Sequence, residues 1–299
     1  MDRIVKLVSG GIDSTIMAKT YPGTNVYVDF GQRYAKEEQK ALNDLDIDCD
    51  VIKIESRFAE NGIYINDRNL TFASIVSMIY DPDIIMIAGL KDDNCKDKTE
   101  EAFKRISDTI SEFANKKIKV VSPYWGKTKG DIIAEYANKE ELLKTFSCYN
   151  PVNGEPCMNC PACLRKTIAL ETNGVKTGKL LSNDIIRQYL NKIHLYDSDR
   201  ISRFFMYLKN YTQVQAIDID GVLCETSGHD YKNSKPIESA IKALNTKNGV
   251  IVLYTARLET DRTMTENWLK KQGVKYDCLI MNKLPYDSIV DDKAKSIKE

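Results

Sequence analysis

The chain has 299 residues, of which 42% are hydrophobic and 29% charged, and its 43 basic residues balance its 43 acidic ones. This composition is typical of a soluble globular protein with two domains of about 150 residues each. The net charge of zero argues against a strong nucleic-acid footprint. The first residues contain no signal-peptide h-region and no apolar run reaches the roughly 18 residues that span a bilayer, so we expect a cytoplasmic protein.

The first predicted element is a short apolar strand at residues 4–8, followed by a glycine-rich turn and by a helix from Ser14. Two adjacent glycines allow backbone conformations that a Cβ would block, so the amide groups can close on a ligand. Together with the free N–H groups of the helix start they form an anion site suited to phosphate. The candidate nucleotide-binding residues are Val8, Ser9, Gly10, Gly11, Ile12, Asp13, Ser14 and Thr15.

This turn is neither a Walker A loop nor a dinucleotide-binding loop. No lysine follows the glycines, and the Gly-x-Gly-x-x-Gly spacing is absent. The simpler alternative is a glycine turn that only connects the strand to the helix.

Further apolar strands are predicted at residues 25–30, 49–54, 83–90 and 118–121, with helices at 35–44, 72–80 and 98–116 and a loop at 55–70. This alternation implies a parallel sheet with right-handed crossovers. Ligands of such sheets lie beyond the carboxyl ends of the strands. We therefore expect the glycine turn, residues 29–34 and residues 91–94 to face the same crevice. Residues 127–131 open the next helix.

Four of the eight cysteines form a cluster with the spacing Cys-x8-Cys-x2-Cys-x2-Cys, namely Cys148, Cys157, Cys160 and Cys163. A metal site explains the cluster better than disulfides do in a chain that is not secreted. Four thiolates suit a structural, tetrahedral Zn²⁺ at about 2.3 Å. An iron–sulfur cluster and four reduced free cysteines are the alternatives.

The motif Ser-Gly-Gly-x-Asp-Ser at 9–14 resembles the loop of ATP pyrophosphatases of the adenine-nucleotide alpha-hydrolase type. With Asp-Phe-Gly-Gln-Arg-Tyr at 29–34, Asp-Arg-Asn-Leu at 67–70 and the cysteine motif that ends at Arg165, the first 180 or so residues resemble 7-cyano-7-deazaguanine synthase, a family of queuosine biosynthesis. The resemblance implies that ATP adenylates 7-carboxy-7-deazaguanine and that ammonia displaces AMP to give an amide. A second ATP then yields the nitrile, and AMP and pyrophosphate are released.

The resemblance also implies roles for two basic residues. Arg68 would contact the base or a phosphate, and Lys129 would neutralise phosphate charge. The alternatives are a surface-loop arginine and a solvated lysine.

Two departures from the family leave the substrate open. The segment before Arg68 is short, and the family's Gly-Tyr-Pro-Asp-Cys-Arg stretch has no clean match near residues 92–103. The product could therefore be the amide, or the acceptor could be another carboxylate or a macromolecule. No glutaminase signature is visible, so free ammonia is the expected nitrogen donor, and a homodimer is a possibility.

A polar, helical connector is predicted at 177–211, and a second domain begins with an apolar strand that ends at Asp218 and Asp220. Carboxylates separated by one strand residue point the same way and can share Mg²⁺, one acting as nucleophile and the other as acid–base. With Thr255, Lys283, Asp291 and Asp292 farther on, this part resembles the haloacid dehalogenase superfamily of phosphohydrolases.

That resemblance implies that Asp218 attacks phosphorus and that Asp220 is the acid–base. Thr255 and Lys283 would hold the phosphoryl oxygens, and the Mg²⁺ ligands would be Asp218, Asp220, Asp291 and Asp292. A degenerate, non-catalytic fold is the alternative. The expected fold is thus α/β with two doubly wound parallel-sheet domains. Residues 1–205 are adenine-nucleotide alpha-hydrolase-like, and residues 206–299 are haloacid dehalogenase-like with a minimal cap.

Overall fold

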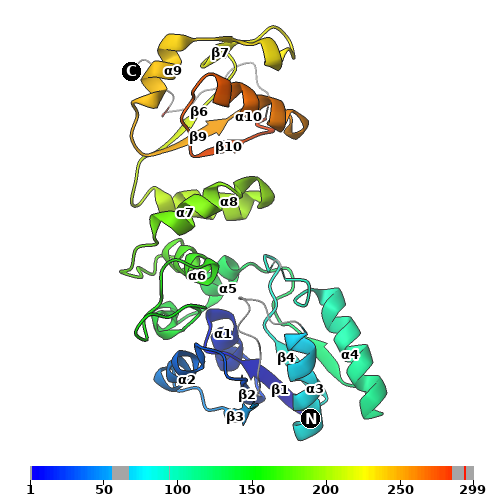
Figure 1. Cartoon of the computed structure of the whole chain (residues 1–299). Coiled ribbons are helices and arrows are strands. Elements are labelled where there is room, and N and C mark those ends of the chain that lie inside the picture. Colours follow the sequence, from blue (N-terminus) through cyan, green and yellow to red (C-terminus); the bar gives the residue numbers. More distant parts are fainter. Residues whose placement is uncertain (1, 56–66, 94, 285–292, 294–299) are drawn as a thin grey trace. The chain divides into compact units, whose positions relative to one another are not determined.

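The computed structural model of the chain describes residues 2–55, 67–93, 95–284 and 293 (Figure 1). Two compact units divide between Ser182 and Asn183. Among the described residues, no helix is both long and apolar enough to cross a membrane.

The first unit contains a five-stranded parallel sheet with the order β3-β2-β1-β4-β5. Its strands are β1 (Ile4–Val8), β2 (Thr24–Asp29), β3 (Asp50–Lys53), β4 (Ile84–Ile87) and β5 (Lys119–Val121). The strand order reverses at the pair β1–β4. In open α/β sheets, ligands bind at such a switch point, beyond the carboxyl ends of the strands.

Helices cover both faces of this sheet, as Figure 1 shows. On one face α3 (Arg68–Tyr80) and α4 (Glu100–Ala114) share a core with Val26, Val28, Ile85 and Ile87. The alternate strand residues Tyr27 and Met86 belong to the cores beneath α2 (Ala35–Asp44) and beneath α1 (Ile12–Thr20), α5 (Lys129–Glu135) and α6 (Pro161–Glu171). Because successive strand side chains point to opposite faces, this alternation accounts for the doubly wound arrangement.

Two helices of the first unit begin earlier than the sequence indicates. Helix α1 starts at Ile12 instead of Ser14, and α3 starts at Arg68, so the predicted loop at 55–70 extends too far. A long-range contact supports this early start, because Asn69 Nδ2 donates to the Asp97 carboxylate at 2.9 Å and to its carbonyl at 3.0 Å.

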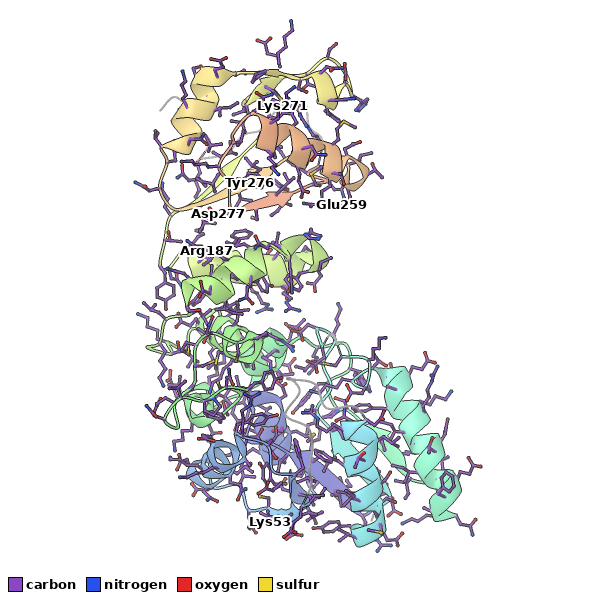
Figure 2. The ribbon with its side chains drawn as sticks, in the orientation of Figure 1. Lys53, Arg187, Glu259, Lys271, Tyr276 and Asp277 are labelled. Atoms are coloured by element: carbon purple, nitrogen blue, oxygen red, sulfur yellow. The ribbon has the colours of Figure 1, made fainter. Side chains whose placement is uncertain are left out.

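The second unit contains a three-stranded parallel sheet with the order β10-β9-β6. The strands are β6 (Val214–Ile217), β9 (Val250–Tyr254) and β10 (Cys278–Ile280), and the crossover helices are α9 (Glu238–Asn245) and α10 (Arg262–Lys271). Asp277, labelled in Figure 2, accepts a hydrogen bond from the Ile251 N–H at 2.8 Å and so aligns β10 with β9. The short hairpin β7 (Cys224–Glu225) and β8 (Lys235–Pro236) is the only insertion between Asp220 and α9 in this described part.

The predicted connector at 177–211 is not one helix. It forms α7 (Asn183–Leu190), a short 3-10 turn at Ile193–Leu195 and α8 (Ser198–Leu208). Tyr189 packs on Phe204 with 4.3 Å between ring centroids, so the two helices bury an apolar side against each other. They cluster with the second compact unit, which therefore begins at residue 183, earlier than the boundary expected after residue 205.

Candidate functional site

The glycine turn follows β1 directly and is held on both sides. Gly10 has φ +68°, and a Cβ there would lie 2.7 Å from the backbone oxygen of Glu38 on α2, so only glycine fits. Ser14 Oγ accepts from the Ser9 N–H at 3.1 Å, and the Phe146 N–H donates to the Gly10 carbonyl at 2.8 Å. The first N–H groups of α1 have no partners within the helix and remain available to an anion.

An ion pair joins this turn to a helix more than a hundred residues away. Lys129, the first residue of α5, pairs with Asp13, and their side chains are 12% and 16% exposed. The Lys129 N–H also donates to Asp92 Oδ1 at 3.2 Å. Lys129 is therefore not a solvated lysine, and its ammonium lies beside the start of α1.

The segment after β4 supplies a second group of charges. Asp93, 3% exposed, meets Arg165 Nη1 of α6 at 2.9 Å and Lys98 Nζ at 3.4 Å. Arg165 Nη2 also reaches Asp92 Oδ2 at 3.4 Å. Across this cluster the carboxylates of Asp13, Asp92 and Asp93 balance the positive charges of Lys98, Lys129 and Arg165.

Burial and ion pairing shift the pKa values of Asp93 and Lys98 in opposite directions, and the combined effect of the ion pairs is larger. Burial alone raises the pKa of Asp93, but the charges of Lys98 and Arg165 hold that pKa well below its ordinary value. Burial alone lowers the pKa of Lys98, but the Asp93 carboxylate keeps it above its ordinary value. Asp93 and Lys98 therefore stay ionised at neutral pH, which preserves a fixed pair of charges next to the turn.

Arg68 lies on the other side of this crevice, at the start of α3. Its charge acts on Tyr34 and Tyr149, whose rings lie 5.9 Å apart, and on Lys98. Arg68 is half-buried, so it is not an arginine of an exposed loop. Arg33 Nη1 donates to Asn150 Oδ1 at 2.6 Å and ties the 29–34 segment to the segment that carries Tyr149.

The four clustered cysteines converge as the spacing predicts. The sulfur atoms of Cys148, Cys157, Cys160 and Cys163 all lie within 4.8 Å of one another. Tetrahedral sulfur ligands of one Zn²⁺ stand about 3.8 Å apart, whereas a multi-iron cluster separates its cysteines further. Backbone N–H groups also point at the sulfurs, with Cys157 N at 3.2 Å from Cys148 Sγ. This donor set fits a single structural metal ion.

In the second unit, each of the two carboxylates at the strand end is paired with a buried, positively charged side chain. Asp218 Oδ2 lies 2.5 Å from Lys283 Nζ. Asp220 is bound through both oxygens by Arg257, with Nε at 2.8 Å and Nη2 at 2.7 Å. Burial alone raises the pKa of Asp220, but the Arg257 hydrogen bonds and charge bring it below its ordinary value.

The remaining residues predicted for this second site are placed only in part. Thr255 is fully buried, its carbonyl accepts from the Lys283 N–H at 2.9 Å, and its Oγ1 accepts from the Arg257 N–H at 3.3 Å. Asp291 and Asp292 lie outside the described residues. Thr255 thus contacts the backbones of Lys283 and Arg257, the two residues whose side chains pair with Asp218 and Asp220.

Two charged residues of the first crevice, Lys98 and Arg165, are not identified as site residues from the sequence. Asp92 and Asp93 belong to residues 91–94, which the sequence predicts to lie at the same edge as the glycine turn because they follow the buried strand β4. Lys98 falls where the family's motif has no clean match, and Arg165 belongs to the cysteine motif.

Comparison with known proteins places the similarity in the first unit. Residues 53–174 match the family described as Queuosine biosynthesis protein QueC. The 7-cyano-7-deazaguanine synthase of Campylobacter curvus is 27% identical over 220 residues, which cover 59% of this chain and 96% of that protein. The Archaeoglobus fulgidus 7-cyano-7-deazaguanine synthase is 25% identical, with 66% and 96% covered. These matches support a relationship of the N-terminal unit to this family.

Solved structures add little to that relationship. A predicted tRNA methyltransferase subunit of Methanocaldococcus jannaschii is 18% identical and covers 44% of this chain and 72% of its own, with a TM-score of 0.35. A Vibrio cholerae protein is 25% identical over 29% of this chain and 85% of its own, with a TM-score of 0.25. Similarities this low carry no argument.

Proposed function

We propose that the first unit is an ATP-dependent ligase that converts 7-carboxy-7-deazaguanine and ammonia to 7-cyano-7-deazaguanine through an adenylate and an amide. A carboxylate is a poor electrophile, and adenylation gives it AMP as a leaving group. The departing pyrophosphate is anionic, so its release is favoured by amide groups and cations that are already in position. The relatives named above support the substrate class.

The observation that carries this proposal is the Asp13–Lys129 pair beside the glycine turn. It holds an ammonium, only 12% exposed, next to the free N–H groups at the start of α1. Arriving phosphate oxygens would take over Lys129, and Asp13 would then be free to accept a Mg²⁺ ion that comes with ATP. The Ser9 hydroxyl lies at the same turn, 3.3 Å from Ser14 Oγ.

Incubation of the protein with ATP, ammonium and 7-carboxy-7-deazaguanine tests the proposal. AMP and a product of nitrile mass support it, and AMP with a product of amide mass restricts it to the first half of the reaction. Formation of ADP contradicts it. Formation of AMP only with a protein or RNA acceptor supports the alternative, an adenylating enzyme that modifies a macromolecule.

We assign Zn²⁺ to the four clustered cysteines as a structural ion. It would hold the segment 148–163 so that Tyr149 and Arg165 are presented to the crevice. Four protein ligands leave no open position on the ion, so it takes no part in the chemistry.

A second activity, Mg²⁺-dependent phosphate hydrolysis, is favoured by the 2.5 Å pair of Asp218 and Lys283. In this arrangement Asp218 would act as the carboxylate nucleophile and Lys283 would supply the cation for phosphoryl oxygens, at the end of the first strand of the second unit. Thr255 would bind a phosphoryl oxygen, and Asp291 and Asp292 would complete the Mg²⁺ site. With a short hairpin as its only described cover, the site would accept bulky phosphates.

Phosphate release from a panel of nucleotides, sugar phosphates and nucleic-acid ends tests this second activity on the full chain with Mg²⁺. Asp218→Asn should abolish the release and leave AMP formation by the first unit intact. A residual rate equal to that of the unchanged protein would rule Asp218 out as the nucleophile.

A further inference from the structure

Among the described residues, the Glu38 carboxyl group of the first crevice forms no ion pair and contacts a different set of groups. Glu38 of α2 accepts hydrogen bonds from Tyr27 Oη at 2.9 Å and from Gln32 Nε2 at 2.8 Å. Both bonds go to Oε2. Among the described residues no donor reaches Oε1, so one oxygen orients the carboxyl and the other is available to a proton.

The surroundings of Glu38 include charged groups from each neighbouring element. Asp29 lies at the end of β2, Arg68 opens α3, and Tyr34 belongs to the turn before α2. The pKa of Glu38 is raised to about 7, because the effect of burial, to which the charge of Asp29 adds, exceeds the lowering by the hydrogen bonds from Gln32 and Tyr27 and by the charge of Arg68. Glu38 can therefore exchange a proton near neutral pH.

Glu38 also belongs to the same crevice as the glycine turn. Its backbone oxygen is the atom that a Cβ on Gly10 would meet, so α2 and the turn are in contact. Tyr34, whose pKa Glu38 raises by its charge, packs against Tyr149 with the two rings tilted by 52°. Tyr149 in turn feels the charges of Lys98 and Arg165, so Glu38 and the charged cluster flank the same aromatic pair.

We infer that Glu38 is the proton acceptor of the ammonia step, an inference that rests on the proposed ligase function. Ammonia attacks the adenylate carbonyl carbon through its lone pair, which gives a nitrogen with three protons and a positive charge. The Glu38 carboxylate takes one of these protons, the bond between carbon and the AMP oxygen breaks, and AMP leaves with that electron pair. The products are the neutral amide, AMP and protonated Glu38.

Three other acids of the crevice are poorly suited to this task. Asp13, Asp92 and Asp93 are held by lysine or arginine, and Asp93 in particular has a lowered pKa. A base whose pKa lies near the working pH is the most effective, because it is both available and basic enough. Glu38 meets this requirement because of where it is buried.

A comparison of the two half-reactions tests the inference. Adenylate formation, measured as substrate-dependent exchange of labelled pyrophosphate into ATP, needs no base for ammonia. Glu38→Gln should leave the exchange rate within about twofold and slow amide formation about 100-fold, the range of one general base. Glu37→Gln, on the same helix turn, is the matched control and should change neither rate. Equal amide formation by Glu38→Gln and the unchanged protein would overturn the inference.

A pH profile gives a second readout that a purely structural role would not change. Rates are compared at a constant concentration of free NH₃, so that the titration of ammonium does not enter. Tyr27→Phe removes one donor from Oε2, so it should raise the pKa of Glu38 and move the acidic limb of amide formation to higher pH. An unmoved limb would contradict the inference. Absence of exchange in the unchanged protein would instead contradict the proposed ligase function.

Discussion

The residues that follow the first strand carry opposite charge preferences in the two units: groups that attract anions follow β1, and carboxylates follow β6. After β1 the chain places two glycines and a helix start, so backbone amides face the crevice, and a lysine from a distant helix joins them. After β6 it places Asp218 and Asp220, whose charges are matched by Lys283 and Arg257. Parallel sheets bring strand ends to one edge in both units. The residues that follow the strand therefore decide whether that edge attracts a triphosphate or a cation.

The comparison also shows a difference in how far the pairing reaches. In the first unit Arg165 meets acids more than seventy residues earlier, and the ionised cluster depends on several crossovers being in place. In the second unit both pairs are made around one small sheet. A substitution in the first site should therefore disturb more segments of the chain than a substitution in the second site.

Loss of the cysteine site should give the largest difference between the activities of the two units. Cys160→Ser should reduce bound zinc from about one ion per chain to nearly none and lower AMP formation by more than about 100-fold, because a structural zinc supplies folding free energy directly. Metal analysis and AMP assays measure these changes. Cys49→Ser, a cysteine outside the cluster, should behave like the unchanged protein. A zinc-free Cys160→Ser protein with full AMP formation would show that the metal site is dispensable.

The Asp13–Lys129 pair is the next most sensitive point. Lys129→Met should raise the KM for ATP and lower kcat/KM for AMP formation about 100-fold, equivalent to about 2.7 kcal/mol. Lys127→Met removes a lysine whose partner Glu135 is exposed, and it should have little effect. Steady-state kinetics of AMP release distinguishes the two. Equal losses in both variants would mean that the position of Lys129 at the turn is unimportant.

In the second unit, a substitution of Arg257, which contacts both carboxylate oxygens of Asp220, should have a smaller effect on activity. Arg257→Lys keeps the charge but loses the planar two-point contact with Asp220, so phosphate release should fall about 10-fold. AMP formation should not change. Arg203→Lys, an i,i+4 pair with Asp199 on α8, is the control. A loss of AMP formation in Arg257→Lys would show that the units depend on each other.

The last expected effect is a change in how the free energy of unfolding depends on pH. The pKa of Glu38 is about 7 in the folded protein and near 4.5 in the unfolded chain, so the folded state holds more protons between these values. Its contribution is therefore present at low pH and is lost as pH rises through about 7. Glu38→Gln should become more stable relative to the unchanged protein between pH 5 and pH 8. Denaturant unfolding at several pH values measures this, and parallel curves would contradict it.

The sequence by itself determined the alternation of strands and helices, the glycine turn and the cysteine cluster, because each of these is written in local spacing. It also indicated that residues after β1, β2 and β4 meet at one edge. It did not show that Arg68 opens a helix, because a contact from Asn69 to the distant Asp97 accompanies that early start.

Only the tertiary structure decided how Asp93 stays charged and which of two adjacent glutamates is hydrogen-bonded by Tyr27 and Gln32. Glu37 and Glu38 are equivalent in a charged helical segment, but adjacent side chains on a helix point in different directions, and α2 directs Glu38 toward Tyr27 and Gln32. The pKa of Asp93 likewise depends on Lys98 and Arg165, which the crossovers bring within 3.4 Å. Burial and Coulomb energy depend on distances in space, and residue spacing along the chain does not contain them.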